Sequence, residues 1–264
     1  MIFTEPVPFR EALNAQAVKA VLPTDLRSDL LSQLPAAIRE RALFSAGVQN
    51  AELLDRVNRG IEQILKGEKT EAQVREELVN LDKFMSDPEL SKNGRLDLVI
   101  NTNVDMARGY GQWKQGQRAA ILDVYPAQEL FRSEDRKEPR DWPERWAAAG
   151  GQFFEGDSDY PEGRMIALKN DPIWTEISAF GLPYAPFDYN SGMDVQDIDR
   201  DEAESLGLIE PDDTVEPEDR GFNEDLQAKP DILDDALVSA MEIFLHGVAR
   251  FGQDGVLRLI GGAL

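Results

Sequence analysis

Charged residues are the candidates for chemistry in this chain, because it has no cysteine and only one histidine. The sequence has no cysteine, which excludes thiolate nucleophiles, thiolate metal sites and disulfides. Its single histidine, His246, excludes multi-histidine metal sites and argues against histidine acid–base catalysis. An enzyme built from this sequence would therefore use arginines and carboxylates, with Arg136, Arg140, Asp188 and Asp194 as the candidates.

A second pattern with possible chemistry is the spacing of Asp197, Asp199 and Asp201, which looks like the start of a calcium loop. The sixth position of that loop is Glu202, where a glycine is needed for the sharp turn, and the twelfth is Leu208, where a bidentate glutamate is needed. The sequence also has no P-loop, no G-x-G-x-x-G after a strand and no H-E-x-x-H. We therefore expect no catalytic, cofactor-binding or metal-binding residues.

The charge balance of the chain limits its partners. The 264 residues include 28 basic and 50 acidic side chains, for a formal net charge of −22. Such a surface repels phosphate backbones, so we expect no direct sequence-specific binding of nucleic acid. No run of about 18 apolar residues occurs and the first ten residues lack a basic start, so we predict no membrane span and no signal peptide. The composition predicts a soluble intracellular protein with a sizeable core.

One stretch, Asp171–Met193, combines helix signals with an aromatic loop that several prolines interrupt. Asp171 is suited to cap a helix and Gly181 to end one in a left-handed conformation, which predicts a helix over Pro172–Phe180. We expect this helix to pack on a sheet and the following loop to cover the Arg95–Gly116 helix. The alternative is a core-packed loop with no further role.

Helical periodicity dominates the first half of the chain, from Glu11 to Met85, where prolines interrupt a run of short helices. Apolar spacing predicts helices around Ile38–Ala46 and after Asn50, and Thr70 with Gln73 forms a capping box for another. The longest predicted helix is Arg95–Gly116. Asn103 lies within its apolar stripe, so we expect its amide to bond to neighbouring backbone.

The second half of the chain shows both strand-like and helical patterns. Its predicted strands are Ala127–Arg132, Gln152–Phe154 and Arg164–Leu168, and short helices are expected after Asp141 and after Asp199. An acidic segment at 211–230 is predicted to be a linker, and Asp231–Phe251 shows the pattern of an amphipathic helix that packs on its own chain or on a partner.

These elements predict an α+β fold that is mostly α. It contains an N-terminal helical bundle with a long central helix, a small mixed domain with a short β-sheet, and a C-terminal amphipathic helix. The predicted divisions are an N-terminal arm at 1–10, a helical region at 11–94, a mixed domain at 95–210, the acidic linker at 211–230 and the C-terminal helix and tail at 231–264.

Three segments in this order resemble the phage Mu F-like minor head protein family, also called phage head morphogenesis proteins. They are Arg95–Trp113 with its internal Thr102-Asn103, Ala127–Gly151 with Arg136 and Arg140 in a charged turn, and the proline-rich stretch Asp171–Met193. The order and spacing of the segments carry the resemblance, over roughly residues 36–210. The mixed domain at 95–210 would be the family's domain. Its family-motif or structural candidates here are Thr102, Asn103, Arg136, Arg140, Trp174, Asp188 and Asn190.

The resemblance implies a role in assembly rather than in catalysis. Proteins of this family enter the procapsid in a few copies, are thought to associate with the portal and support head maturation or DNA delivery. The partners expected from the resemblance are the portal protein, the major capsid protein or the scaffold protein, and the expected location is the host bacterial cytoplasm during assembly and then the virion head. Many members carry a histidine and two cysteines in the closing motif, where this chain has Asp188, Ser191 and Met193. No metal or nucleophilic role of those residues transfers to this chain.

Two alternatives stay open from the sequence. The first is an enzyme, a toxin-like transferase or nuclease that uses the arginines and carboxylates named above. The second is an acidic decoy that binds basic host partners through its charge. The sequence does not decide the oligomeric state.

Overall fold

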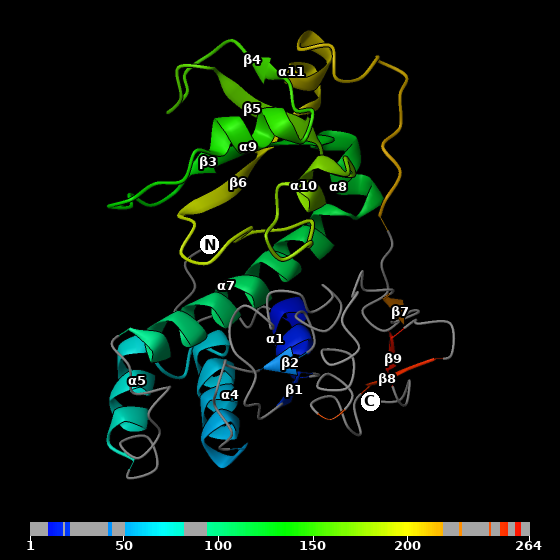
Figure 1. Cartoon of the computed structure of the whole chain (residues 1–264). Coiled ribbons are helices and arrows are strands. Elements are labelled where there is room, and N and C mark those ends of the chain that lie inside the picture. Colours follow the sequence, from blue (N-terminus) through cyan, green and yellow to red (C-terminus); the bar gives the residue numbers. More distant parts are fainter. Residues whose placement is uncertain are drawn as a thin grey trace. The chain divides into compact units, whose positions relative to one another are not determined.

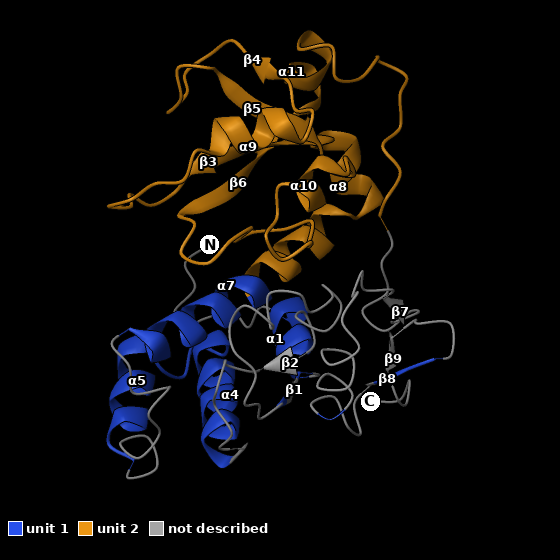
Figure 2. Ribbon diagram, viewed as in Figure 1, with its two compact units in different colours: residues 1–107, 221–264 blue, residues 108–220 orange. Residues whose placement is uncertain are grey.

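The computed structural model describes residues 10–17, 19–21, 42–43, 51–81, 94–218, 227–228, 243, 249–252 and 257–259. The chain divides into two compact units, residues 1–107 with 221–264 as unit 1 and residues 108–220 as unit 2 (Figure 2). The division falls inside the long helix rather than at residue 95. Helices predominate and sheets are small, which confirms the predicted α+β class (Figure 1). No described helix has the length and apolar character that crossing a membrane requires.

Unit 1 is built on helices α1 (Arg10–Ala17), α4 (Ala51–Leu65), α5 (Glu71–Val79) and the first part of α7 (Arg95–Gly116). Buried apolar side chains from these helices form one core. The predicted bounds of α7 are confirmed, and so is the capping box of α5. There the Thr70 hydroxyl accepts a hydrogen bond from the backbone of Gln73, whose side chain accepts one from the backbone of Thr70.

Two short strands replace predicted helix in unit 1. Strand β1 (Ala20–Val21) pairs in parallel with β2 (Ala42–Leu43). The helical spacing of Val21 with earlier residues, and of Ala42 with its neighbours, predicted helices at both places. Both predictions are wrong at these residues, because pairing between segments distant in sequence satisfies the backbone here, and local periodicity does not report such pairing.

The C-terminal segments also differ from the predicted tail. Strands β7 (Gln227–Ala228), β8 (Ala249–Phe251) and β9 (Leu257–Leu259) form a three-stranded antiparallel sheet in the order β7-β9-β8. The predicted helix through Phe251 is therefore wrong at its last three residues, and the predicted linker contains a strand. Ile243 is helical. The other residues of the predicted tail helix, and the N-terminal arm at 1–9, lie outside the described residues.

A four-stranded antiparallel sheet organises unit 2. Its order is β4-β5-β3-β6, formed by β4 (Phe153–Phe154), β5 (Arg164–Leu168), β3 (Ala127–Arg132) and β6 (Met193–Ile198). The predicted bounds of β3 and β5 are confirmed. In the central register, Leu130 faces Met165 on one side and Val195 on the other.

Both faces of this sheet are covered. On one face, Leu130 and Met165 pack with tryptophans from α9 (Trp142–Ala148) and α10 (Ile173–Glu176). On the other, Ala127 and Ile166 pack with residues of α8 (Ala119–Val124) and α11 (Arg200–Ser205). Because the sheet is sandwiched in this way, alternate residues of β3 point into two separate cores.

The predicted helix Pro172–Phe180 is too long, because α10 ends at Glu176 and the backbone N–H of Ala179 donates to the carbonyl of Phe187 instead of to a helical carbonyl.

Two other parts of unit 2 also depart from the prediction. The first is β6, which the sequence presents only as the start of an acidic run. The second is the beginning of the predicted linker, where Val215 is buried in the second core and the backbone N–H of Glu218 donates to the side-chain oxygen of Gln117 at 2.8 Å. The side chains of Asn170 and Arg200 also donate to backbone carbonyls of this segment, so it packs on the unit although it is acidic.

Candidate functional site

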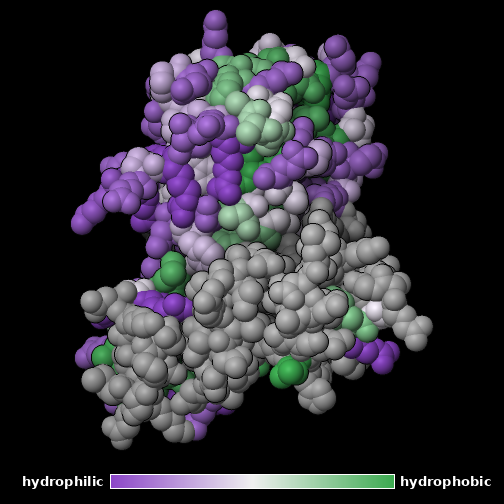
Figure 3. All heavy atoms as spheres, viewed as in Figure 1, coloured by the Kyte–Doolittle hydropathy of each residue, from purple (hydrophilic) through white to green (hydrophobic). Residues whose placement is uncertain are grey.

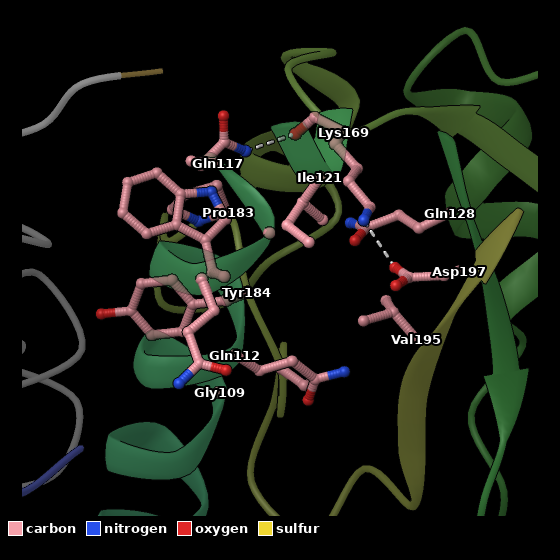
Figure 4. A pocket seen from close by; sticks show the side chains of 14 residues that line it. Gly109, Gln112, Gln117, Ile121, Gln128, Lys169, Pro183, Tyr184, Val195 and Asp197 are labelled. Atoms are coloured by element: carbon pink, nitrogen blue, oxygen red, sulfur yellow. Dashed lines mark hydrogen bonds and ion pairs between the residues drawn. The ribbon is translucent and has the colours of Figure 1, made fainter. Parts of the chain in front are cut away.

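One candidate binding site is a pocket of about 210 Å³ in unit 2 (Figure 4). One wall comes from the C-terminal end of α7, a second from the loop at 183–185 and a third from strands β3 and β6 with the residue that follows β5. Its lining residues are mostly amides and aromatics: Gly109, Gln112, Trp113, Gln115, Gly116, Gln117, Ile121, Gln128, Lys169, Pro183, Tyr184, Ala185, Val195 and Asp197.

Charged and amide groups meet at the sheet side of the pocket. The ammonium of Lys169, a residue only 4% exposed, lies 2.6 Å from a carboxylate oxygen of Asp197. Figure 4 shows Lys169, Gln128 and Asp197 pointing toward one another. This arrangement follows from the register, since Gln128 and Asp197 are direct partners across β3 and β6. The ion pair leaves this wall without net charge.

Aromatic rings form the opposite side. Tyr184 packs edge-on against Tyr110 at 5.7 Å between ring centroids and lies 6.0 Å from the ring of Trp113. Gly109 allows this approach, because a Cβ atom there would collide with the carbonyl oxygen of Ala185. The loop therefore packs on α7, as predicted for the Asp171–Met193 stretch.

The second gathering of functional candidates is an ion-pair cluster around Asp188. Its carboxylate oxygen lies 3.1 Å from Arg140 Nε and 3.0 Å from Arg145 Nη1. Arg140 also donates to the backbone carbonyl of Tyr189 at 2.8 Å. Two of the predicted site residues, Arg140 and Asp188, are thus brought together. Their ion pair joins the charged turn that contains Arg140 to the loop that contains Asp188.

The other predicted candidates in unit 2 do not take part in the ion pairs of Asp188. Arg136 pairs with Glu134 at 2.6 Å on an exposed turn. Trp174 is fully buried, and its indole N–H donates to the carbonyl of Leu168 at 2.8 Å. Asn190 is exposed with φ of 47°, and its backbone carbonyl accepts a hydrogen bond from Arg140.

Thr102 and Asn103 belong to unit 1, on the first part of α7. Thr102 is buried. Asn103 donates to the carbonyl of Val99 at 2.8 Å, as predicted, and its side-chain oxygen accepts from the ammonium of Lys19 at 2.8 Å. The amide is therefore satisfied within the unit and has the character of a structural residue.

The other face of the sheet carries a buried ion-pair network that the sequence did not indicate. Arg164 reaches Glu129 at 2.7 Å and Glu202 at 2.5 Å, and Gln196 donates to Glu129 at 2.9 Å. The hydrogen bonds that Arg164 donates to the Glu129 carboxylate are the main cause that raises the pKa of Arg164 above its usual value. All partners face one another, so this network ties β3, β5, β6 and α11 together rather than presenting free groups.

No match came from comparing the chain with family models, curated proteins and solved structures. The site is therefore interpreted from its own geometry. Within the described ranges, no group of three or more histidine, cysteine or carboxylate side chains is placed to hold a metal ion.

Sequence reasoning missed the pocket residues Lys169 and Gln128. Each looks ordinary in the sequence, one as a lysine after a strand and the other as a polar residue within one. A usable signal for Gln128 was its position in the strand Ala127–Arg132, two residues before the buried Leu130 and therefore on the same face. Its partner Asp197 lies on β6, which was not predicted as a strand, so the convergence of the two could not be derived.

Replacing Asp188 with asparagine should lower the free energy of unfolding by about 1–2 kcal/mol, because two arginines lose a charged acceptor that is only 14% exposed. Urea unfolding would measure the loss. The matched control is Glu134→Gln, which breaks the exposed pair with Arg136 and should cost at most about 0.5 kcal/mol. Equal effects of the two variants would show that the Asp188 cluster contributes no more than a surface pair.

The stability of the chain should also depend on Asp194. Burial raises the pKa of Asp194, against a lowering by the hydrogen bond from the Val195 backbone. A folded-state pKa above the unfolded value means that ionisation costs stability above both pKa values. Asp194→Asn should therefore stabilise the protein at pH 7, and this gain should shrink as the pH falls and vanish below the unfolded value near 3.8. Unfolding midpoints across pH, with the exposed Asp212→Asn as the charge control, would measure this. If Asp194→Asn and Asp212→Asn stabilised the protein equally at pH 7, burial of Asp194 would not explain the effect.

Proposed function

We propose that the chain is a non-catalytic minor head protein of a phage or prophage. In this role it binds the portal protein, or the capsid or scaffold protein, during head morphogenesis and assists DNA packaging or ejection. It acts in the host bacterial cytoplasm during assembly and is then a component of the virion head.

The observation that carries the proposal is where the three resembling segments meet. The end of α7 supplies Tyr110 and Trp113, the second segment supplies Trp146, and the third supplies Trp174 and Tyr184. Trp146 and Trp174 lie 5.4 Å apart between ring centroids, and Tyr184 packs on the two aromatic residues of α7. The third segment thus packs against each of the other two. Segments far apart in sequence that pack together in this way are expected to be inherited as one domain, which supports a shared family origin.

The surface of unit 2 is compatible with a protein partner. Figure 3 shows hydrophilic side chains over much of its visible face, with hydrophobic side chains exposed between them. The net charge of −22 favours basic protein surfaces and disfavours packaged DNA. The arginines and Asp188 considered for an enzyme pair with carboxylates or with each other, so they supply no observation in favour of catalysis.

The test is association with phage heads. The tagged chain would be produced together with the portal protein of the same genome, and we expect the portal to be retained with it in a pull-down. The chain should also co-sediment with procapsids. Its absence from purified heads, together with no retention of portal, capsid or scaffold protein, would reject the proposal.

A further inference from the structure

The pocket of unit 2 contains buried hydrogen-bonding groups that the described chain leaves unused. The side chain of Gln128 is buried and points into the pocket, and its amide has no hydrogen-bond partner among the described residues (Figure 4). The indole N–H of Trp113, a second buried lining residue, is also unpartnered within the described part of the chain. Buried polar groups are normally satisfied, so the Gln128 amide indicates a site completed by another molecule. The Trp113 nitrogen is itself enclosed, so this residue lines the pocket with its ring and not with its N–H.

The charge of the pocket specifies what kind of molecule fits. The ammonium of Lys169 is already neutralised by Asp197 at 2.6 Å, and the face of the Tyr125 ring lies 5.8 Å from the same ammonium. A charged ligand would have to displace one member of this pair. A neutral ligand would leave it intact and would need groups that both donate and accept, which is what a glutamine amide offers.

The surface beside the pocket indicates a polymer rather than a free small molecule. Helix α8 and the residue that caps its end expose three apolar side chains, with Ile121 at 36%, Val124 at 49% and Tyr125 at 38%. Ile121 also lines the pocket, and Tyr125 borders its lysine, so the apolar surface continues from the pocket onto the helix. A peptide segment would cover both, because its backbone carries amides and its side chains carry apolar area.

We propose that this pocket binds an uncharged peptide segment of a partner protein. One backbone amide of the segment pairs with the Gln128 amide, and an apolar side chain packs against Pro183, Tyr184 and the ring of Trp113. The inference rests on the proposed role as an interaction protein and names the surface that such a partner would occupy.

The test uses the full chain, labelled with ¹⁵N, and N-acetyl-L-leucine methylamide as the probe. The chain has four tryptophans, and the other three, Trp142, Trp146 and Trp174, lie in the core on the sheet. We expect a saturable shift of the Trp113 indole signal, assigned with Trp113→Phe, and no shift of the other three. N-acetyl-L-leucine, which carries a carboxylate, should bind at least about tenfold more weakly, since it competes with Asp197.

Two variants and one control make the result specific. Gln128→Met keeps the size of the side chain and removes its amide. Gln112→Ala changes an exposed residue that lines the pocket, and this substitution does not affect the core. Gln128→Met should weaken binding of the probe about fivefold or more and Gln112→Ala less, while the exposed Gln152→Met should leave binding unchanged.

Three outcomes would overturn the inference. They are no saturable shift of Trp113, equal shifts of all four tryptophans, or tighter binding of the carboxylate probe that depends on Lys169. The titration contains no portal or capsid protein. A failed pull-down with a successful titration would therefore reject the proposed partner and keep the peptide site, and the reverse result would reject the site alone.

Discussion

Replacing Trp174 with alanine should lower the free energy of unfolding by about 3–5 kcal/mol. The indole is fully buried and packs at 5.4 Å from the ring of Trp146 and 6.0 Å from that of Phe187, and its N–H satisfies the carbonyl of Leu168. The substitution therefore leaves a large cavity in the core on the sheet. It also removes one of two hydrogen bonds to the Leu168 carbonyl, which keeps the bond from the backbone N–H of Asp171. Urea unfolding followed by circular dichroism would measure the loss.

Three comparisons make this measurement decisive. Trp174→Phe keeps most of the apolar contact and should lose clearly less. Val124→Ala, at a side chain that is 49% exposed in the same unit, should lose less than about 0.5 kcal/mol. Phe187→Ala should cost about as much as Trp174→Ala, and the double variant should cost less than the sum because the two rings share contacts. A loss below about 1 kcal/mol for Trp174→Ala would contradict the packing described for this core.

The elements that could be predicted from the sequence are those that local signals specify. Helix α7 has the predicted bounds because its apolar residues keep one face for its whole length and Gly94 precedes its first turn. Strands β3 and β5 were predicted because their residues favour extended backbone between turn residues. The same holds for the caps of α5 and α11, where the Thr70 and Asp199 side chains accept from backbone three residues on.

The elements that could not be predicted are those that distant pairing specifies. In strand β6 the apolar residues Met193 and Val195 alternate, but Gln196 and Asp197 follow before the buried Ile198, so the alternation is not sustained. It is a strand because β3 offers it a hydrogen-bonding edge along six residue pairs. Strands β1, β2, β8 and β9 are likewise defined by partners elsewhere in the chain, which helical spacing in a single segment does not reveal.

The candidate site shows the same limit at the level of side chains. The proline-rich stretch was recognised as important, and its aromatics do close the unit. The charged residues singled out with it, Arg140 and Asp188, form a structural cluster, whereas the pocket is lined by residues of α7, β3 and β6. Gln128 and Lys169 come together with Asp197 only through the register of the sheet, so their shared location depends on a strand that the sequence did not indicate.

Helix α7 offers a test in which one chemical change has opposite effects at two positions. Alanine favours helix over glycine by about 1 kcal/mol, so both Gly109→Ala and Gly116→Ala gain helix propensity. At Gly116 the added methyl group meets no atom closer than 3.6 Å, and we expect a neutral or stabilising effect. At Gly109 it collides with the backbone oxygen of Ala185 and comes within 3.3 Å of the Tyr184 ring, so the loop must move.

Gly109→Ala should therefore lower the free energy of unfolding by about 1–3 kcal/mol despite the gain in propensity, because the loop loses its contacts with Tyr110 and Trp113. Urea unfolding of the two variants side by side would measure the difference. If Gly109→Ala were as stable as Gly116→Ala, the loop would not be closed on α7, and the aromatic wall of the pocket would not exist as described. The same variant should also abolish binding of the methylamide probe, because Pro183 and Tyr184 would no longer face Gln128 across the pocket.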